Sequence, residues 1–394
     1  MGIDIIVLGI ATPIGLYMAA NIGANDLANA MGTSVGSGAI TLRQAVIISM
    51  IANTLGAVLA GGYVTSTISK GMIDPALFTG EPNKLMLGMF AALFAAGVWV
   101  NLATYLGLPV STTHAIVGAV VGFGVLSVGA GAVSWGKIIT IAISWIISPA
   151  AGAFISGWMY YFAEKKILAA RDPYAASERY APFLIFMVFL VLILSMIFKG
   201  LKNLHPELGL FQTILLTIPI AAMAGLFGRR WLRWQVRRVC ELRPGQYEIT
   251  PVDCLFSQLQ VLTACYVAFA HGANDVANAI GPLAAIFSVV TTKSVALQVD
   301  VPFWMLMIGG IAVGGGLFVF GTRVMQTIGK NITEITPIRG FCAEFGAATT
   351  ILICSRLGLP ISTTHVLVGS VVGIGLMRGM GALDLRILKN IGLS

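Results

Sequence analysis

Long apolar stretches separated by short polar ones fill most of this chain. The clearest apolar stretches are 45–65, 84–105, 138–162, 184–198, 208–228 and 303–320. Most of these stretches are close in length to a transmembrane helix, which needs about 20 apolar residues. No stretch shows the residue-by-residue alternation of a membrane β-barrel. The pattern therefore predicts an all-α polytopic membrane protein.

The composition excludes a soluble globular protein. Hydrophobic residues make up 57% of the 394 residues and charged residues only 10%, whereas soluble domains carry about 25% charged residues. The N-terminus, Met1-Gly2-Ile3-Asp4, lacks the basic segment that begins a signal peptide. We therefore expect the first apolar segment to be a helix of the mature protein.

The net charge of +8 is concentrated in two segments that directly adjoin apolar stretches. Because cytoplasmic loops are enriched in Lys and Arg, both segments are predicted to be cytoplasmic. This placement favours a multi-pass protein of the cell membrane, with the lipid bilayer rather than a nucleic acid as its partner. The basic residues are Lys165, Lys166, Arg171 and Arg179 in one segment, and Arg229, Arg230, Arg233, Arg237, Arg238 and Arg243 in the other.

Two polar motifs each occur twice. Gly-Ala-Asn-Asp-Leu-Ala-Asn-Ala at 23–30 returns at 272–279 with Val for Leu, and the Leu-Pro-X-Ser-Thr-Thr-His segment at 107–124 returns at 358–375. The spacing predicts two transport repeats, 1–165 and 251–394, joined by a linker, 166–250, with two spans. Inverted repeats are favoured, since they are common in transporters. Segments 107–124 and 358–375 suit re-entrant hairpins on broken helices, giving about 10–12 membrane segments.

The Ser-Thr-Thr tips are typical of an anion site. Pro109 and Pro360 stop an incoming helix, so the tips stand at helix N-termini, where backbone N–H groups lack intrahelical partners. Such ends bind oxyanions. The alternative is that the hydroxyls only cap a helix break, and the duplication makes it weaker. The predicted oxyanion ligands here are Ser111, Thr112, Thr113, Ser362, Thr363 and Thr364.

The Asn-Asp motifs predict a cation site. Ionisable groups inside apolar helices are costly and usually functional, and clusters of oxygen ligands suit hard cations such as Na⁺. The alternative is hydrogen bonding between neighbouring helices. Neither motif contains Lys or Arg, so a buried oxyanion would need co-bound cations, which favours symport. The predicted sodium ligands are Asn25, Asp26, Asn29, Asn274, Asp275 and Asn278.

Three histidines, His114, His271 and His365, lie in or beside the motifs. They predict either bracing of the hairpins or a proton relay, and bracing is favoured.

Together, the duplicated motifs resemble those of the inorganic phosphate transporter family, the sodium- or proton-coupled phosphate permeases. The resemblance covers nearly the whole chain. It implies phosphate uptake, two inverted repeats, and a site where both Ser-Thr-Thr tips meet both Asn-Asp helices, with Asn25 and Asn274 also contacting phosphate. It further implies Gln258 as a phosphate ligand and Thr263 and Glu344 as sodium ligands. The halves are unequal, because Leu93 stands where the second repeat has Glu344.

The preferred function is sodium-coupled phosphate symport through alternating access at the membrane midplane. Proton-coupled or metal-phosphate symport and sulfate transport remain open. A channel leaves the Ser-Thr-Thr tips unexplained. An enzyme is disfavoured, because Ser111 and His114 have no orienting acid in the local sequence. We expect sodium as the coupling ion and no other cofactor, and a homodimer is left open.

Overall fold

The computed structural model describes residues 2–200, 210–240, 250–295, 301–331 and 336–378. Among these residues the chain is helical and contains no strand; the single extended pairing is an isolated bridge between Ile73 and Val133. The predicted all-α class is confirmed. This follows from the apolar composition, because in lipid a helix satisfies its backbone hydrogen bonds within one segment.

The described helices follow one another as α1 (Gly2–Ile22), η1 (Gly23–Leu27), α2 (Ala28–Gly36), α3 (Leu42–Ala60), α4 (Gly62–Ser66), η2 (Thr67–Gly71), η3 (Pro75–Phe78), α5 (Pro82–Tyr105), α6 (Thr112–Val128), η4 (Ala130–Ala132), α7 (Trp135–Ala163), η5 (Glu164–Leu168), α8 (Pro173–Gly200), α9 (Leu210–Cys240), α10 (Pro251–Thr292), α11 (Phe303–Asn331), α12 (Pro337–Arg356) and α13 (Thr363–Arg378). Eight helical segments are long and apolar enough to cross a membrane. Three shorter apolar helices cover 112–128, 303–319 and 363–378. The first and last of these carry the Ser-Thr-Thr tips, and their length suits re-entrant segments.

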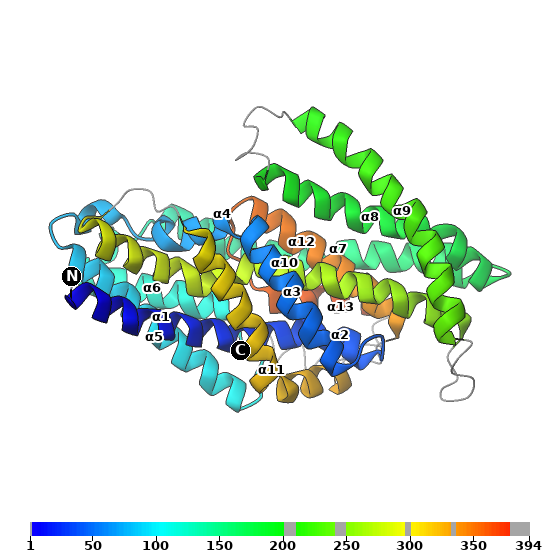
Figure 1. The fold of residues 1–394 in the computed structure, drawn as a ribbon, viewed down its shortest axis with the longest axis horizontal. Helices are drawn as coiled ribbons and strands as arrows, with labels where there is room; N and C mark the ends of the chain where they lie inside the picture. Colours follow the sequence, from blue (N-terminus) through cyan, green and yellow to red (C-terminus); the bar gives the residue numbers. More distant parts are fainter. Residues whose placement is uncertain (1, 201–209, 241–249, 296–300, 332–335, 379–394) are drawn as a thin grey trace.

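Helix α10 runs through the middle of the bundle (Figure 1) and is buried without interruption from Tyr266 to Ile286. It packs against α3, α12, α5 and α1, whereas α8 and α9 pack on each other to one side (Figure 1). Glycines permit its closest crossings: a Cβ on Gly272 would lie 1.9 Å from the Asn53 carbonyl oxygen, and one on Gly56 would lie 1.9 Å from that of Phe269. Small residues at crossings are typical of membrane helices.

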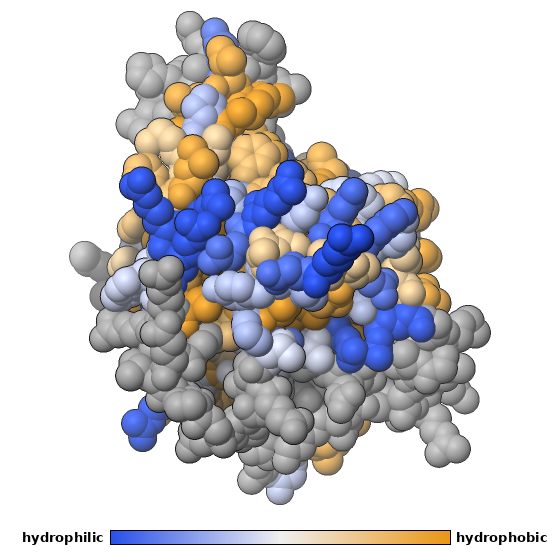
Figure 2. All heavy atoms as spheres, turned by 90° about the vertical axis from the view of Figure 1, so that its right-hand side faces the viewer, coloured by the Kyte–Doolittle hydropathy of each residue, from blue (hydrophilic) through white to orange (hydrophobic). Residues whose placement is uncertain are grey.

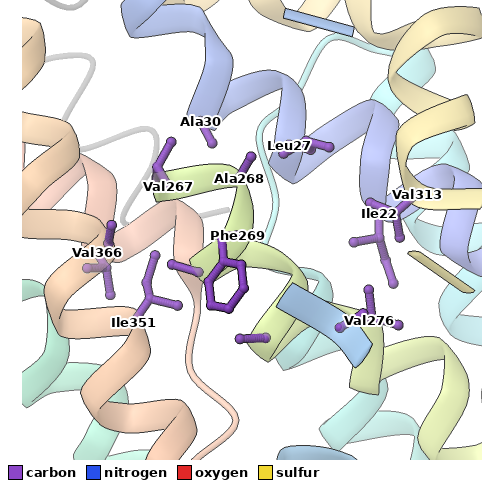
Figure 3. Packing of buried hydrophobic residues seen from close by; sticks show 14 of the residues in the cluster. Ile22, Leu27, Ala30, Val267, Ala268, Phe269, Val276, Val313, Ile351 and Val366 are labelled. Atoms are coloured by element: carbon purple, nitrogen blue, oxygen red, sulfur yellow. The ribbon is translucent and has the colours of Figure 1, made fainter. Parts of the chain in front are cut away.

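The two Asn-Asp motifs have different backbones. The first forms the π-helical turn η1, whereas the second continues the regular α-helix α10. Single π-turns are frequent at functional sites. Buried hydrophobic side chains from α1, η1, α2, α10, α11, α12 and α13 pack within and next to the two motif segments (Figure 3): Ile22, Leu27, Ala30, Val267, Ala268, Phe269, Val276, Val313, Ile351 and Val366. The polar motifs therefore lie inside an apolar shell.

Candidate functional site

The first asparagine of each Asn-Asp motif holds the turn that precedes a Ser-Thr-Thr tip. The Asn25 Nδ2 donates to the Leu108 carbonyl at 3.0 Å, and its Oδ1 accepts from the Val110 N–H at 3.1 Å. In the second repeat Asn274 makes the matching bonds, to the Leu359 carbonyl at 3.0 Å and from the Ile361 N–H at 3.3 Å. The amides also donate to Thr104 and Ser355, respectively. Both asparagines therefore fix the tips in place.

The serine of each tip is a helix N-cap. The Ser111 Oγ accepts from the His114 N–H at 3.1 Å, and the Ser362 Oγ accepts from the His365 N–H at 3.2 Å. The N–H groups of the two threonines that follow each serine occupy the first helical positions, which have no intrahelical acceptor. Each tip thus presents backbone donors at the positive end of a helix dipole, as an oxyanion requires.

The threonine hydroxyls join the tips to the carboxylates. Thr112 donates to Asp26 Oδ2 at 2.5 Å, and Thr363 donates to Asp275 Oδ2 at 2.5 Å. The two repeats also exchange contacts, because Thr364 donates to Asp26 Oδ1 at 2.8 Å. From the same repeat, Asn278 Nδ2 donates to Thr112 and Thr113 at 3.2 and 3.0 Å. In the other direction, the Thr113 hydroxyl donates to the Ile361 carbonyl at 2.9 Å. All four motif copies meet in one buried cluster.

The environment of Asp275 differs from that of Asp26. Asn53 donates through Nδ2 to the Gly310 carbonyl, so its Oδ1 faces His271 Nδ1 at 2.9 Å. This arrangement assigns the hydrogen to Nδ1 and turns His271 Nε2 towards Asp275 Oδ2, 3.1 Å away. Among the described residues, His271 Nε2, Asp275 Oδ1 and Asn278 Oδ1 have no hydrogen-bond partner. Their residues are 0% exposed, and buried polar atoms without partners are rare.

A small cavity adjoins this cluster. Its polar lining comes from Asp26, His271, Thr363 and Thr364, and its apolar lining from Ala30, Val267, Ile351 and Leu367. The cavity has room for about one water molecule or a small ion. One atom each of Asp26, His271 and Asp275 lie within 4.8 Å of one another, close enough to hold one ion. The cavity therefore lies where anionic and cationic ligands can be neighbours.

A second polar cluster surrounds Glu344, which is fully buried. Its Oε1 accepts from Thr33 at 2.7 Å, from Ser34 at 2.5 Å and from Gln260 Nε2 at 3.0 Å. Its Oε2 accepts from Thr263 at 2.6 Å. The oxygens of these groups form a ligand set suited to a hard cation.

The sequence pattern of the phosphate transporter family matches residues 22–394. The chain belongs to the phosphate transporter family. It is 43% identical over 381 residues to a protein of Pyrococcus abyssi named a phosphate permease, covering 97% of this chain and 91% of that protein. It is also 41% identical over 396 residues to the chloroplastic inorganic phosphate transporter 2-1 of Arabidopsis thaliana, covering 96% of this chain and 67% of that protein.

A solved structure described as the sodium-dependent phosphate transporter shares this fold. It superposes with a TM-score of 0.90 at 41% identity, covering 98% of this chain and 94% of that one. Together with the apolar helices, the comparison makes this phosphate transporter a multi-pass membrane protein.

The transporter's other predicted ligands are placed less centrally. Among the described residues, Gln258 makes no hydrogen bond to either cluster. Gln260, about 200° further round α10, contacts Glu344 instead. The side chain of Asn29 lies outside the described residues. His114 and His365 meet each other with ring centroids 5.1 Å apart, and His114 packs on Trp145 at 3.9 Å. The His114 Nε2 has no hydrogen-bond partner among the described residues, so bracing of the hairpins stays a prediction.

Sequence reasoning missed Asn53, Thr33, Ser34 and Gln260. None belongs to a repeated motif. Asn53 has one available signal, because it is an amide in the middle of the apolar span that forms α3.

Proposed function

We propose that this transporter takes up inorganic phosphate by symport with sodium ions at a midplane site of the cell membrane. The observation that carries the proposal is the set of unpartnered buried atoms, Asp275 Oδ1 and Asn278 Oδ1 above all, beside the Ser-Thr-Thr tips. A sodium ion between these oxygens would satisfy both and offset the charge of a phosphate held by the tips. The printed description of the superposable structure, a sodium-dependent phosphate transporter, supports this coupling.

We further propose that residues 1–165 and 251–394 act as inverted repeats around the 166–250 linker. Matching bonds made by Asn25 and Asn274 support a common repeat unit. The second repeat donates to the carboxylate and the tip of the first, and Thr113 of the first repeat donates to the Ile361 carbonyl of the second. Movement of one repeat against the other therefore alters both anion and cation ligands, which is a physical basis for alternating access. Assembly as a homodimer stays a prediction.

Uptake of labelled phosphate into proteoliposomes tests the coupling. We expect an inward sodium gradient to drive accumulation, a pH gradient alone to fail, and excess sulfate not to compete. Proton coupling is the competing hypothesis, because a proton can be held between His271 Nε2 and Asp275 Oδ2. Accumulation that follows a pH gradient with no sodium on either side would support it and exclude the sodium proposal.

The Glu344 cluster is proposed to hold a further sodium ion, in the second repeat only, since Leu93 occupies the equivalent position of the first. Replacing Glu344 by Gln removes the negative charge of the carboxylate that accepts four hydrogen bonds in this cluster. We expect the sodium concentration for half-maximal uptake to rise about tenfold, equivalent to about 1.4 kcal/mol. The measurement is the sodium dependence of uptake at fixed phosphate. The matched control is Glu164→Gln, at an exposed position. If the two variants show the same sodium dependence of uptake, no sodium ion binds at Glu344.

A further inference from the structure

Trp145 of α7 contacts both Ser-Thr-Thr tips. Its indole N–H donates to the Pro360 carbonyl at 2.9 Å, two residues before the Ser362 N-cap of the second tip. Its ring packs on His114, the residue after Thr113 of the first tip, with ring centroids 3.9 Å apart. The two tips therefore meet on one side chain, which comes from neither of their own helices.

Helix α7 is held closely against α13, the helix that begins at the second tip. A Cβ on Gly369 of α13 would lie 2.4 Å from the Pro149 carbonyl oxygen of α7. One turn further along, the Ser156 hydroxyl donates to the Ser370 carbonyl at 2.6 Å. Close backbone contact through glycine is typical of tightly paired membrane helices. Helices α7 and α13 thus form one packed unit, and Trp145 belongs to it.

The backbone in front of the second tip is fixed at two successive peptide groups. In the first group the Pro360 oxygen accepts from Trp145, and the Ile361 N–H donates to Asn274 Oδ1 at 3.3 Å. In the next group the Ile361 oxygen accepts from the Thr113 hydroxyl at 2.9 Å. These groups set the direction in which the helix begins, and hence the direction of its first N–H groups. A change at the Pro360 carbonyl would therefore reorient the donors of the tip.

Trp145 lies far from the polar end of its helix. Figure 2 shows hydrophilic side chains gathered over the end of the molecule where α7 runs into η5. At 1.5 Å per residue, Trp145 is about 30 Å along the apolar span Trp135–Leu168 from Lys165 of that end. Pro360 is buried. Water cannot replace a donor that this carbonyl loses, so the indole N–H is needed there.

We propose that Trp145 is a positioning residue for phosphate, and that it sets the separation and the direction of the two Ser-Thr-Thr tips. The inference rests on the proposed function, in which the tips hold the anion. The indole N–H fixes the second tip, and the ring locates the first tip through His114. Donors that are already in place when phosphate arrives bind it more tightly, because less conformational freedom is lost on binding. Trp145 therefore acts on phosphate affinity through the tips.

The test is W145F, which keeps an aromatic ring beside His114 but removes the indole N–H. Because the buried Pro360 carbonyl then lacks its donor, we expect the KM for phosphate at saturating sodium to rise about tenfold. The kcat should stay near the wild-type value. W145L removes the ring as well and should raise KM further. A general loss of folded protein lowers only the maximal rate, so a change in KM separates positioning from a structural role.

The matched control is W135F. Trp135 makes the same kind of bond, from Nε1 to the Ala130 carbonyl at 2.9 Å, but it lies at the exposed start of α7. W135F should have the wild-type KM. The proposal is overturned if W145F has the same phosphate KM as W135F, or if W145F lowers kcat and leaves KM unchanged. The proposed symport is tested separately in the wild type: accumulation driven by a pH gradient alone would exclude sodium coupling and leave the comparison of KM values intact.

Discussion

Asp275→Asn is expected to abolish sodium-driven phosphate accumulation. Asn keeps the size of the side chain and one oxygen, but it removes the charge from an atom that has no hydrogen-bond partner among the described residues. Losing a charged ligand in a buried site costs about 3 kcal/mol, or about two orders of magnitude in affinity. The measurement is phosphate uptake into proteoliposomes over a range of inward sodium gradients.

Asp253→Asn is the matched control for this substitution. Asp253 lies on the same helix, near its exposed N-terminal end, where it accepts a hydrogen bond from Thr250. The Asp253→Asn variant should transport phosphate like the wild type. If Asp275→Asn also accumulates phosphate at the wild-type rate and with the same sodium dependence, Asp275 is not a sodium ligand.

Gly272→Ala is expected to prevent correct packing of the bundle. The added Cβ would lie 1.9 Å from the Asn53 carbonyl oxygen, so α3 and α10 must separate. Overpacking of this kind costs about 3 kcal/mol or more. The shift would also displace Asn53 and with it the His271 ring. We expect loss of the monodisperse fraction after detergent extraction, measured by size-exclusion chromatography, and a lower melting temperature.

The control for this second substitution is Gly118→Ala. Gly118 is on α6, and a Cβ there meets no atom within 4 Å. Ala is the better helix former by roughly 0.5–1 kcal/mol, so this variant should be at least as stable as the wild type. Equal behaviour of the two variants would contradict the close helix crossing.

Duplication indicated that the motifs serve a site, and the family resemblance implied that all four copies meet there, as their hydrogen bonds do. The family resemblance also implied Thr263 and Glu344 as sodium ligands, and the Thr263 hydroxyl donates to Glu344 Oε2 at 2.6 Å. The re-entrant lengths followed from Pro109 and Pro360. The repeated motifs and the family resemblance were sufficient to name these residues.

The remaining ligands depend on tertiary pairing. Thr33 and Ser34 reach Glu344 across more than 300 residues of chain, and no periodicity encodes such a partner. Asn53 contacts His271 only because two glycine-mediated crossings bring α3 against α10. The π-turn at η1 could not be predicted from the sequence either, because the same Gly-Ala-Asn-Asp sequence forms a regular α-helix in α10. Helix packing rather than local propensity decides these details.

The hydrogen bond from Thr364 to Asp26 has a consequence for synthesis of the protein. These residues are 338 positions apart, so at about 5–20 residues per second the ribosome needs roughly 20 s to a minute to supply the donor. During that interval the first helices are already in the bilayer, and one oxygen of Asp26 lacks its final partner. The nascent chain should therefore depend most on the insertion machinery while only its N-terminal half has been made.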